Sequence, residues 1–294
     1  MPETSGPQED DRERAPDAAV GYDVAALRDL AERAARAAGA LVRQGRPDKV
    51  EVASTKSSAV DVVTQMDLAA ERELRRLLAQ ERPHDGVLGE EGGLQPGTSG
   101  VTWVLDPVDG TVNYLYGLPA YAVSVAAVAG PPDPAAWTLL AGCVHAVADG
   151  RTWTAGRGLG ASLDGRPVRV NDPAPLAESL CGTGFGYRAE RRSAQARVLV
   201  ELLPRVRDIR RIGSAAMDLC LVASGGLDVY YERGLNPWDL AAGQLVAQEA
   251  GAVVTGLRGE PAGSAMTVAG PEPTVRDLAH LLQQWRADED DAAG

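Results

Sequence analysis

The sequence has 294 residues, of which 45% are hydrophobic, and its formal net charge at pH 7 is −12. This length suits one large domain or two sizeable halves. No apolar stretch is long and charge-free enough to cross a bilayer. The acidic charge disfavours nucleic acid as a partner. Cys143, Cys181 and Cys220 are odd in number and widely spaced, so we expect a soluble protein of the reducing cytoplasm.

The first half of the chain is predicted to combine two helices with a largely antiparallel sheet. Residues 1–17 are polar and Pro-rich and lack the apolar region of a signal peptide, so we expect a disordered tail. Apolar residues recur at helical spacing over 20–44 and over 65–80. The segments VTWVLD, YAVSVAAVAG, TLLAGCVHAVA and RTWTAG then predict strands. Residues 18–165 therefore form an α+β half.

The second half, residues 166–287, shows a different pattern. The short apolar segments SLCGTGFG, DIRRIG, LDVYY and AVVTG alternate with helical segments near 190–203, 214–224, 238–250 and 273–286. Such alternation is typical of an α/β layer. Residues 288–294 form an acidic C-terminal tail, and the two halves are expected to meet near residue 165.

Histidine-dependent chemistry has little support in this sequence. His84, His145 and His280 do not occur in a Ser/His/Asp pattern or at zinc-ligand spacing. A structural role is favoured for each of them.

Carboxylates occur instead at strand ends and helix starts. Glu90 lies in the Gly-flanked loop GEEGG, Asp106 ends the next strand, Asp109 follows in the turn of DPVDG, and Asp239 begins a helix in NPWDLAAG. Such positions can converge at the carboxyl edge of a sheet. Several carboxylates in one pocket need a cation, and oxygen ligands with few histidines select Mg²⁺ or Mn²⁺ over zinc.

Each of these fragments also has a simpler interpretation. DPVDG is compatible with a type I turn, GEEGG with an acidic surface loop, and NPWDLAAG with a helix start that has Asn236 as its cap and Pro237 at its first position. Their occurrence together and in this order is what favours a functional site.

Four blocks of the sequence resemble the inositol monophosphatase family of Mg²⁺-dependent, lithium-sensitive phosphatases. The blocks are KSSAVDVVTQMD (56–67), GEEGG (89–93), WVLDPVDGTVNYLYGLPAYAVSVA (103–126) and GSAAMDLCLVASGGLDVYYERGLNPWDLAAGQLVAQEAGA (213–252). The resemblance covers about residues 20–285. It implies a layered αβαβα sugar-phosphatase fold, a homodimer, inhibition by lithium, and hydrolysis of myo-inositol monophosphate or a related polyol phosphate.

The resemblance also implies two or three Mg²⁺ ions per site. Glu90, Asp106 and the backbone carbonyl of Val108 would hold the first ion. Asp106, Asp109 and Asp239 would hold the second, with Asp106 bridging the two. Glu90 would orient a third ion through water.

The same resemblance implies which residues bind the phosphate and position the nucleophile. The phosphate would rest on the metal ions and on the backbone N–H groups of Gly110 and Thr111, where glycine permits close approach. Asp67 would hydrogen-bond the Thr111 hydroxyl, and this pair, together with Glu90, would position a metal-activated water. Lys56 matches a lysine of the family motif near the site.

For the alcohol, the resemblance implies Glu232, the side chains of Asp109 and Asp239, and the backbone near Ala215. A solvated glutamate after a strand is the alternative for Glu232. The aromatic residues are interpreted as core or rim packing rather than substrate stacking; they are Tyr114, Tyr116, Tyr121 and Trp238.

Other substrates and a non-catalytic role remain as alternatives. Val112 stands where the histidinol-phosphatase branch usually has lysine, and fructose 1,6-bisphosphate is a further candidate. A nucleotide 3′-phosphatase would need basic residues for a second phosphate. Those available are Arg188, Arg191, Arg192, Arg210, Arg211 and Arg233. Residues 188–192 are interpreted instead as a solvated loop and helix start.

Some bacterial relatives of the family are associated with RNA-processing or transcription machinery. A purely regulatory partner would be expected to lose metal ligands or to gain a basic surface. Here all four carboxylate positions are present and the charge is acidic, which favours catalysis.

Overall fold

The computed structural model describes residues 21–47, 50–56 and 62–290. The tail predicted for residues 1–17 and the last four residues of the acidic tail lie outside the described residues. Within the described ranges, no helix has both the length and the apolar character needed to span a membrane.

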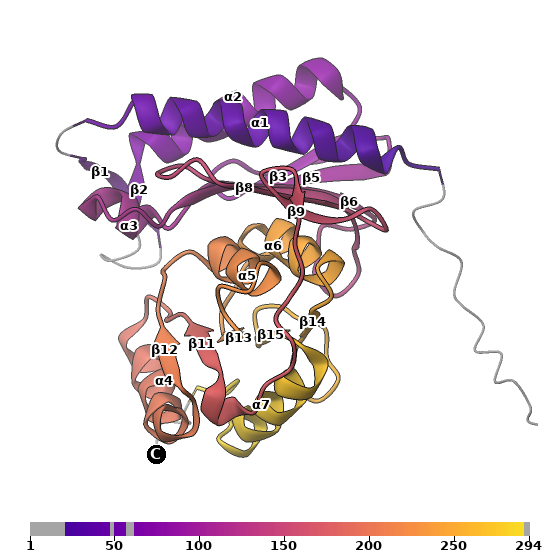
Figure 1. Cartoon of the computed structure of the whole chain (residues 1–294). Helices are drawn as coiled ribbons and strands as arrows, with labels where there is room; N and C mark the ends of the chain where they lie inside the picture. Colours follow the sequence, from indigo (N-terminus) through magenta and orange to yellow (C-terminus); the bar gives the residue numbers. More distant parts are fainter. Residues whose placement is uncertain (1–20, 48–49, 57–61, 291–294) are drawn as a thin grey trace, which may run out of the picture.

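The fold consists of five alternating layers of helices and sheets (Figure 1). An eight-stranded sheet and a five-stranded sheet are each covered on both faces, and one helix pair lies between the two sheets. The pairs, taken from the top of Figure 1, are α1 (Val24–Gln44) with α2 (Gln65–Glu81), α5 (Ala215–Ala223) with α6 (Pro237–Glu249), and α4 (Ala189–Leu202) with α7 (Glu272–Gln284). The predicted αβαβα arrangement is confirmed.

The eight-stranded sheet is antiparallel except where β3 pairs with β5. Its strand order is β10-β9-β8-β7-β6-β5-β3-β4. The strands are β3 (Gly86–Gly89), β4 (Gly93–Gln95), β5 (Val101–Asp109), β6 (Ala122–Ala129), β7 (Thr138–Ala146), β8 (Thr152–Gly156), β9 (Gly160–Leu163) and β10 (Arg166–Pro167). The largely antiparallel sheet predicted for the first half is therefore present.

The five-stranded sheet is mixed, with the order β12-β11-β13-β15-β14. Its strands are β11 (Leu180–Thr183), β12 (Asp208–Arg210), β13 (Val229–Glu232), β14 (Val253–Thr255) and β15 (Thr267–Gly270). The strand β11 is parallel to β12 and β13, whereas β15 runs antiparallel to its neighbours. The sequence reading missed β15, because four buried residues are too few to show a period.

Short elements complete the chain. They are the hairpin β1 (Val52–Thr55) with β2 (Val62–Thr64), the helix α3 (Thr111–Tyr116), and the 3₁₀ turns η1 (Leu176–Glu178) and η2 (Leu203–Arg205).

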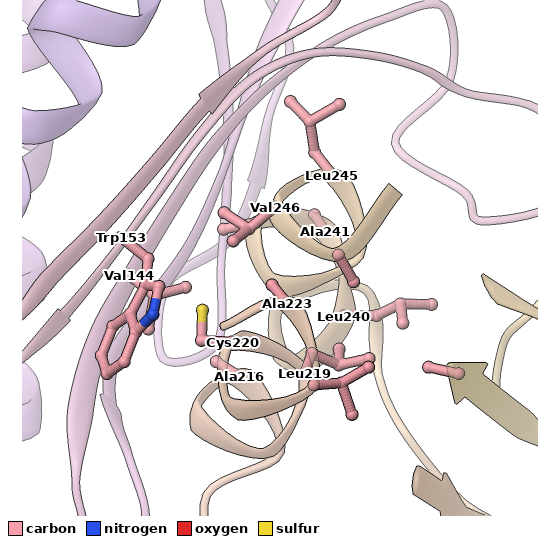
Figure 2. Packing of buried hydrophobic residues seen from close by; sticks show 14 of the residues in the cluster. Val144, Trp153, Ala216, Leu219, Cys220, Ala223, Leu240, Ala241, Leu245 and Val246 are labelled. Atoms are coloured by element: carbon pink, nitrogen blue, oxygen red, sulfur yellow. The ribbon is translucent and has the colours of Figure 1, made fainter. Parts of the chain in front are cut away.

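The middle helix pair is locked between the sheets by close packing of small residues. Figure 2 shows Trp153 and Val144 of the large sheet facing Cys220 and Ala216 of α5. A Cβ at Gly243 of α6 would lie 2.9 Å from Leu219 Cβ, so only glycine lets the two helices approach this closely. The close contact between Gly243 and Leu219 fixes how α5 and α6 pack against each other. The three cysteines are buried and form no disulfide.

Candidate active site

A cavity of about 430 Å³ opens where β5, α5 and α6 meet the loop after β3. Its volume falls in the range of small-molecule sites. The cavity wall contains the predicted site residues from Lys56 to Asp239 with one exception. The exception is Asp67, which does not line the cavity but accepts a hydrogen bond from the Thr111 hydroxyl.

Both aspartates of DPVDG lie on β5. The pairing with β6 is regular up to Asp106 opposite Ser124 and resumes at Asp109 opposite Ala122, so β5 contains one extra residue at this point. Residues three apart in a regular strand point to opposite faces, whereas this bulge lets both carboxylates reach the cavity. The prediction that Asp106 ends the strand and that Asp109 lies in a turn is therefore wrong.

Gly110 follows the bulge with φ of 96°, in the left-handed region. A Cβ at this position would lie 2.8 Å from Ala120 O and 3.1 Å from Gly213 O. Both the backbone conformation and the lack of space require glycine. Gly110 and Thr111 both line the cavity.

The start of α6 places the third aspartate. Asn236 is the N-cap and Pro237 the first helical residue, as predicted. Asp239 Oδ2 accepts a hydrogen bond from Asn236 N at 2.7 Å, so the capping box fixes this side chain from the local sequence.

Asp109 is held by the start of α5. Its Oδ2 accepts hydrogen bonds from Ser214 Oγ and Ala216 N, each at 2.7 Å. Ala215, the first residue of α5, lies between these two donors and lines the cavity. This arrangement fixes the Asp109 carboxylate against the start of α5.

Asp106, Asp109 and Asp239 bring carboxylate oxygens within 4.8 Å of one another. Burial, followed by the neighbouring carboxylates, raises the pKa of Asp106 and of Asp239 well above the usual range. Burial also raises the pKa of Asp109 to about 6, although hydrogen bonds from the Ser214 side chain and from the backbone at the start of α5 act in the opposite direction. Three buried carboxylates repel one another strongly, and a hard divalent cation is what such a donor set fits.

Glu90 lies in the same cavity but is engaged by Lys56. Lys56 Nζ donates to Glu90 Oε1 and to Glu91 Oε1, each at 2.7 Å. Burial raises the pKa of Glu90 to about 7 despite the nearby ammonium group. Burial lowers the pKa of Lys56, but the two carboxylates outweigh it and raise the pKa overall.

The GEEGG loop is held by Glu71, a residue that the sequence reading missed. Glu71 is buried on α2, and its carboxylate accepts from Glu91 N at 2.7 Å and from Gly92 N at 2.8 Å. Arg75 Nε lies 2.7 Å from Glu71 Oε1. The sequence does contain a signal, because Asp67, Glu71 and Arg75 are four residues apart and share one helix face.

Asp67 links the start of α2 to α3. Thr111 Oγ1 lies 3.0 Å from Asp67 Oδ1 and 3.0 Å from Val108 O, so its hydroxyl proton is directed to one of these two acceptors. Asp67 Oδ2 accepts from the backbone N–H of Thr64 at 2.8 Å in a capping box. Burial raises the pKa of Asp67, and the hydrogen bonds offset part of that rise.

Glu232 lines the cavity and is not a solvated surface residue. Tyr230 Oη donates to Glu232 Oε2 at 2.7 Å, and burial raises the pKa of Glu232 to about 7. Gly184 faces this carboxylate so closely that a Cβ would overlap it. Tyr114 and Tyr121 are buried and form an edge-to-face pair 5.2 Å apart, which supports the core interpretation for these two. Tyr116 is exposed, and Trp238 lies at the cavity wall.

The histidines lie elsewhere in the described structure. His145 is buried on β7 with Nδ1 2.8 Å from Thr152 Oγ1, and it does not line the cavity. His280 lies on α7 and His84 in the turn before β3. Their positions agree with structural roles.

The layered fold with a carboxylate cluster in its cavity defines a metal-dependent phosphatase of the sugar-phosphatase type. The chain belongs to the inositol monophosphatase family, whose model matches residues 23–289.

Comparison with known proteins agrees with this assignment. Inositol-1-monophosphatase SuhB of Mycobacterium tuberculosis is 45% identical over 280 residues, which cover 89% of this chain and 94% of that protein. A protein named Nus factor SuhB from Xylella fastidiosa is 39% identical over 260 residues, which cover 86% of this chain and 91% of that protein. The solved structure of Mycobacterium tuberculosis SuhB has a TM-score of 0.75 at 43% identity and covers 90% of this chain and 98% of that chain.

Proposed function

We propose that this phosphatase hydrolyses myo-inositol monophosphate to inositol and inorganic phosphate and that it depends on Mg²⁺. The observation that carries the proposal is the cluster of Asp106, Asp109 and Asp239 in one cavity with Glu232. The cluster suits a divalent cation, and a carboxylate such as Glu232 suits the hydroxyls of a polyol. The name of the Mycobacterium tuberculosis relative supports the same substrate.

The residues present fit two or three Mg²⁺ ions. Glu90, Asp106 and the Val108 carbonyl are proposed for the first ion, Asp106, Asp109 and Asp239 for the second, and Glu90 through water for a third. When bound, such ions lower the pKa of water and neutralise the charge of the phosphate and of the leaving oxygen.

The chain's own residues position the nucleophile. When the Thr111 hydroxyl donates its proton to Asp67 Oδ1, the lone pairs of its oxygen are free to accept a hydrogen bond from the attacking water. Glu90 is the second acceptor for that water. The backbone N–H groups of Gly110 and Thr111 are proposed to bind the phosphate oxygens.

The alcohol is proposed to bind on the other side of the phosphate. Glu232 accepts hydrogen bonds from ring hydroxyls, and Tyr230 fixes its carboxylate at 2.7 Å. Asp109, Asp239 and the backbone at Ala215 complete this side. Each of these groups can form hydrogen bonds with the hydroxyls of the alcohol. An apolar alcohol would leave them without partners, so the site distinguishes a polyol from an apolar alcohol.

The test is phosphate release by the purified protein, with and without Mg²⁺, from inositol 1-phosphate, fructose 1,6-bisphosphate, histidinol phosphate and adenosine 3′,5′-bisphosphate. The Asp109→Asn variant serves as the blank. Selective Mg²⁺-dependent hydrolysis of inositol 1-phosphate is expected. Preference for another ester would overturn the substrate assignment and leave the metal site standing.

The Xylella fastidiosa relative named Nus factor SuhB supports a second candidate, a regulatory role without catalysis. Failure of the metal-loaded protein to hydrolyse any of the four esters would favour that role. We also propose that the protein is a homodimer and that lithium inhibits it. Sedimentation equilibrium and a lithium titration of the Mg²⁺-dependent rate test these two points.

A further inference from the structure

Four arginines line the same cavity as the carboxylate cluster, namely Arg188, Arg191, Arg211 and Arg233, and two of them, Arg191 and Arg233, share an acidic partner. Arg191 lies in the first turn of α4, and Arg233 directly follows β13. A Cβ at Gly186 would lie 2.7 Å from Arg191 Cδ, and a Cβ at Gly234 would lie 2.8 Å from Arg191 Nη1. The side chain of Arg233 is 12% exposed. Both guanidinium groups are thus packed in place, which lowers the entropy lost when an anion binds.

A carboxylate of this chain already binds the arginine pair. Asp290, which follows α7, places Oδ1 2.8 Å from Arg233 Nη1 and 3.6 Å from Arg191 Nε. Asp290 lines the neighbouring pocket between α4 and the segment after α7, so one carboxylate contacts from outside the cavity two arginines that also line it. Guanidinium groups bind carboxylate and phosphate oxygens by the same geometry, so the contact shows which chemistry this place accepts.

The position of Arg191 is unfavourable for helix stability. Arg188 is the N-cap of α4 and Arg191 lies in its first turn, where the helix dipole repels cations. No side chain caps this end of α4. An anion bound between the arginines offsets both costs, which gives a physical reason for retaining the pair.

A ligand anion can replace the Asp290 carboxylate at the two arginines. The carboxylate of Asp290 is 43% exposed, and ion pairs with an exposed partner contribute little net free energy. A ligand phosphate carries more charge than the carboxylate and can displace it.

We propose that Arg191 and Arg233 form a subsite for a second anionic group, namely a second phosphate, on the phosphorylated substrate, and that Asp290 pairs with the same two guanidinium groups from the neighbouring pocket when that group is absent. The inference rests on the proposed function of the cavity as the phosphatase site. A monophosphate leaves the Asp290 contact in place, whereas a bisphosphate replaces it. Asp290 therefore tunes the discrimination between the two kinds of ester.

The experiment compares two competitors that differ in one phosphate. Inhibition constants of fructose 1-phosphate and fructose 1,6-bisphosphate are measured against hydrolysis of inositol 1-phosphate at constant free Mg²⁺ and ionic strength. The readout is the ratio of the two constants. Asp290→Asn is expected to shift this ratio about threefold in favour of the bisphosphate, and Arg233→Gln about tenfold against it.

Matched controls come from the same regions of the chain. Glu289→Gln removes the same charge next to Asp290, but Glu289 pairs with Arg286. Arg210→Gln removes an arginine that pairs with Asp208 and does not line the cavity. Both controls are expected to leave the ratio within about 1.5-fold of its original value.

A ratio that neither Asp290→Asn nor Arg233→Gln shifts beyond the controls overturns the inference, even if inositol 1-phosphate is hydrolysed normally. If another ester proves to be the substrate, the proposed function fails, and the same ratio measured with that ester still decides the question. Thermal unfolding identifies an Arg233→Gln protein that does not fold, in which case Asp290→Asn alone decides.

Discussion

Lys56 and Glu90 form an ion pair inside the cavity, with 2.7 Å between Nζ and Oε1. The same ammonium group contacts Glu91 at 2.7 Å. Glu90 is also proposed as a metal ligand, so a metal ion and the ammonium group act on the same carboxylate. Removing either cation leaves a carboxylate with a raised pKa facing other acidic groups.

The Lys56→Met variant is expected to lose stability in a pH-dependent way when metal is removed with a chelator. At pH 8 Glu90 is ionised and loses its partner, at a cost of about 1 to 2 kcal/mol. At pH 5 Glu90 is protonated, because its pKa is raised to about 7, and the cost is smaller. Denaturant unfolding at both pH values measures the difference.

The control for Lys56→Met is Arg33→Gln, which breaks an exposed pair with Glu81. That change is expected to have the same small effect at both pH values. An equal loss at pH 5 and pH 8 in Lys56→Met would contradict the assigned role of the ammonium group.

The chelated wild-type protein should lose stability as the pH rises. Burial raises the pKa of Asp109 to about 6 and of Glu90 to about 7, so the folded protein binds more protons than the unfolded chain above about pH 4. The slope of unfolding free energy with pH is then negative, and the loss contributed by Glu90 levels off only about one pH unit above its pKa of about 7. Thermal unfolding in chelator from pH 4.5 to 8 tests the sign.

Mg²⁺ should reverse this loss at pH 8. Binding at a hundredfold excess over Kd contributes about 2.7 kcal/mol for one site.

For the pH dependence in chelator, a protein that is more stable at pH 8 than at pH 5 would show that the carboxylates do not dominate the pH dependence.

Asp109→Asn should remove most activity and preserve the fold. The amide keeps the shape and can still accept from Ser214 and Ala216, but it removes a charged ligand, and we expect the rate to fall at least about 100-fold. In chelator the variant should be as stable as wild type or more so, since one repelling charge is gone. Asp172→Asn, at an exposed position paired with Arg169, is the control. Near-wild-type turnover would disprove the two-metal assignment.

The Thr111 hydroxyl and Asp67 should act as one unit. Thr111→Val is expected to lower kcat by about 10- to 100-fold with little change in KM, because it removes an acceptor for water, and Thr111→Ser should retain most activity. Asp67→Asn should lower kcat and also cost about 1 kcal/mol of stability, because both Asp67 oxygens act as acceptors, for Thr64 N and for the Thr111 hydroxyl, and an amide has only one acceptor oxygen. Steady-state kinetics of the two single variants and the double variant test the coupling; additive losses would argue against it.

Gly110→Ala should destabilise the protein more than alanine at an open glycine with similar φ. A Cβ at Gly110 meets Ala120 O at 2.8 Å, whereas one at Gly165, with φ of 75°, meets nothing within 4 Å. We expect a cost of about 2 to 4 kcal/mol at Gly110 and about 1 kcal/mol at Gly165. Equal costs in denaturant unfolding would show that the close contact has no energetic role.

Local patterns were sufficient for α1, α2 and the four helices of the second half and for several site residues, but they did not predict the short helix α3. The helices α1 and α2 have a clear apolar period, and the cap at Asn236 with Pro237 places Asp239 from neighbouring residues alone. The family blocks identified the carboxylates that the cavity brings together. The boundary near residue 165 stays a prediction, as do the roles of the individual site residues.

The sequence by itself determined the family and which carboxylates are present, because these follow from ordered motifs, and the layer order followed from the family resemblance that those motifs carry. Only the tertiary structure decided how those carboxylates meet. The bulge in β5 depends on pairing with β6, the support of GEEGG depends on Glu71 of α2, and the contact of Asp290 with Arg233 joins residues 57 positions apart. Each of these depends on contacts between distant segments, which leave no period in the local sequence.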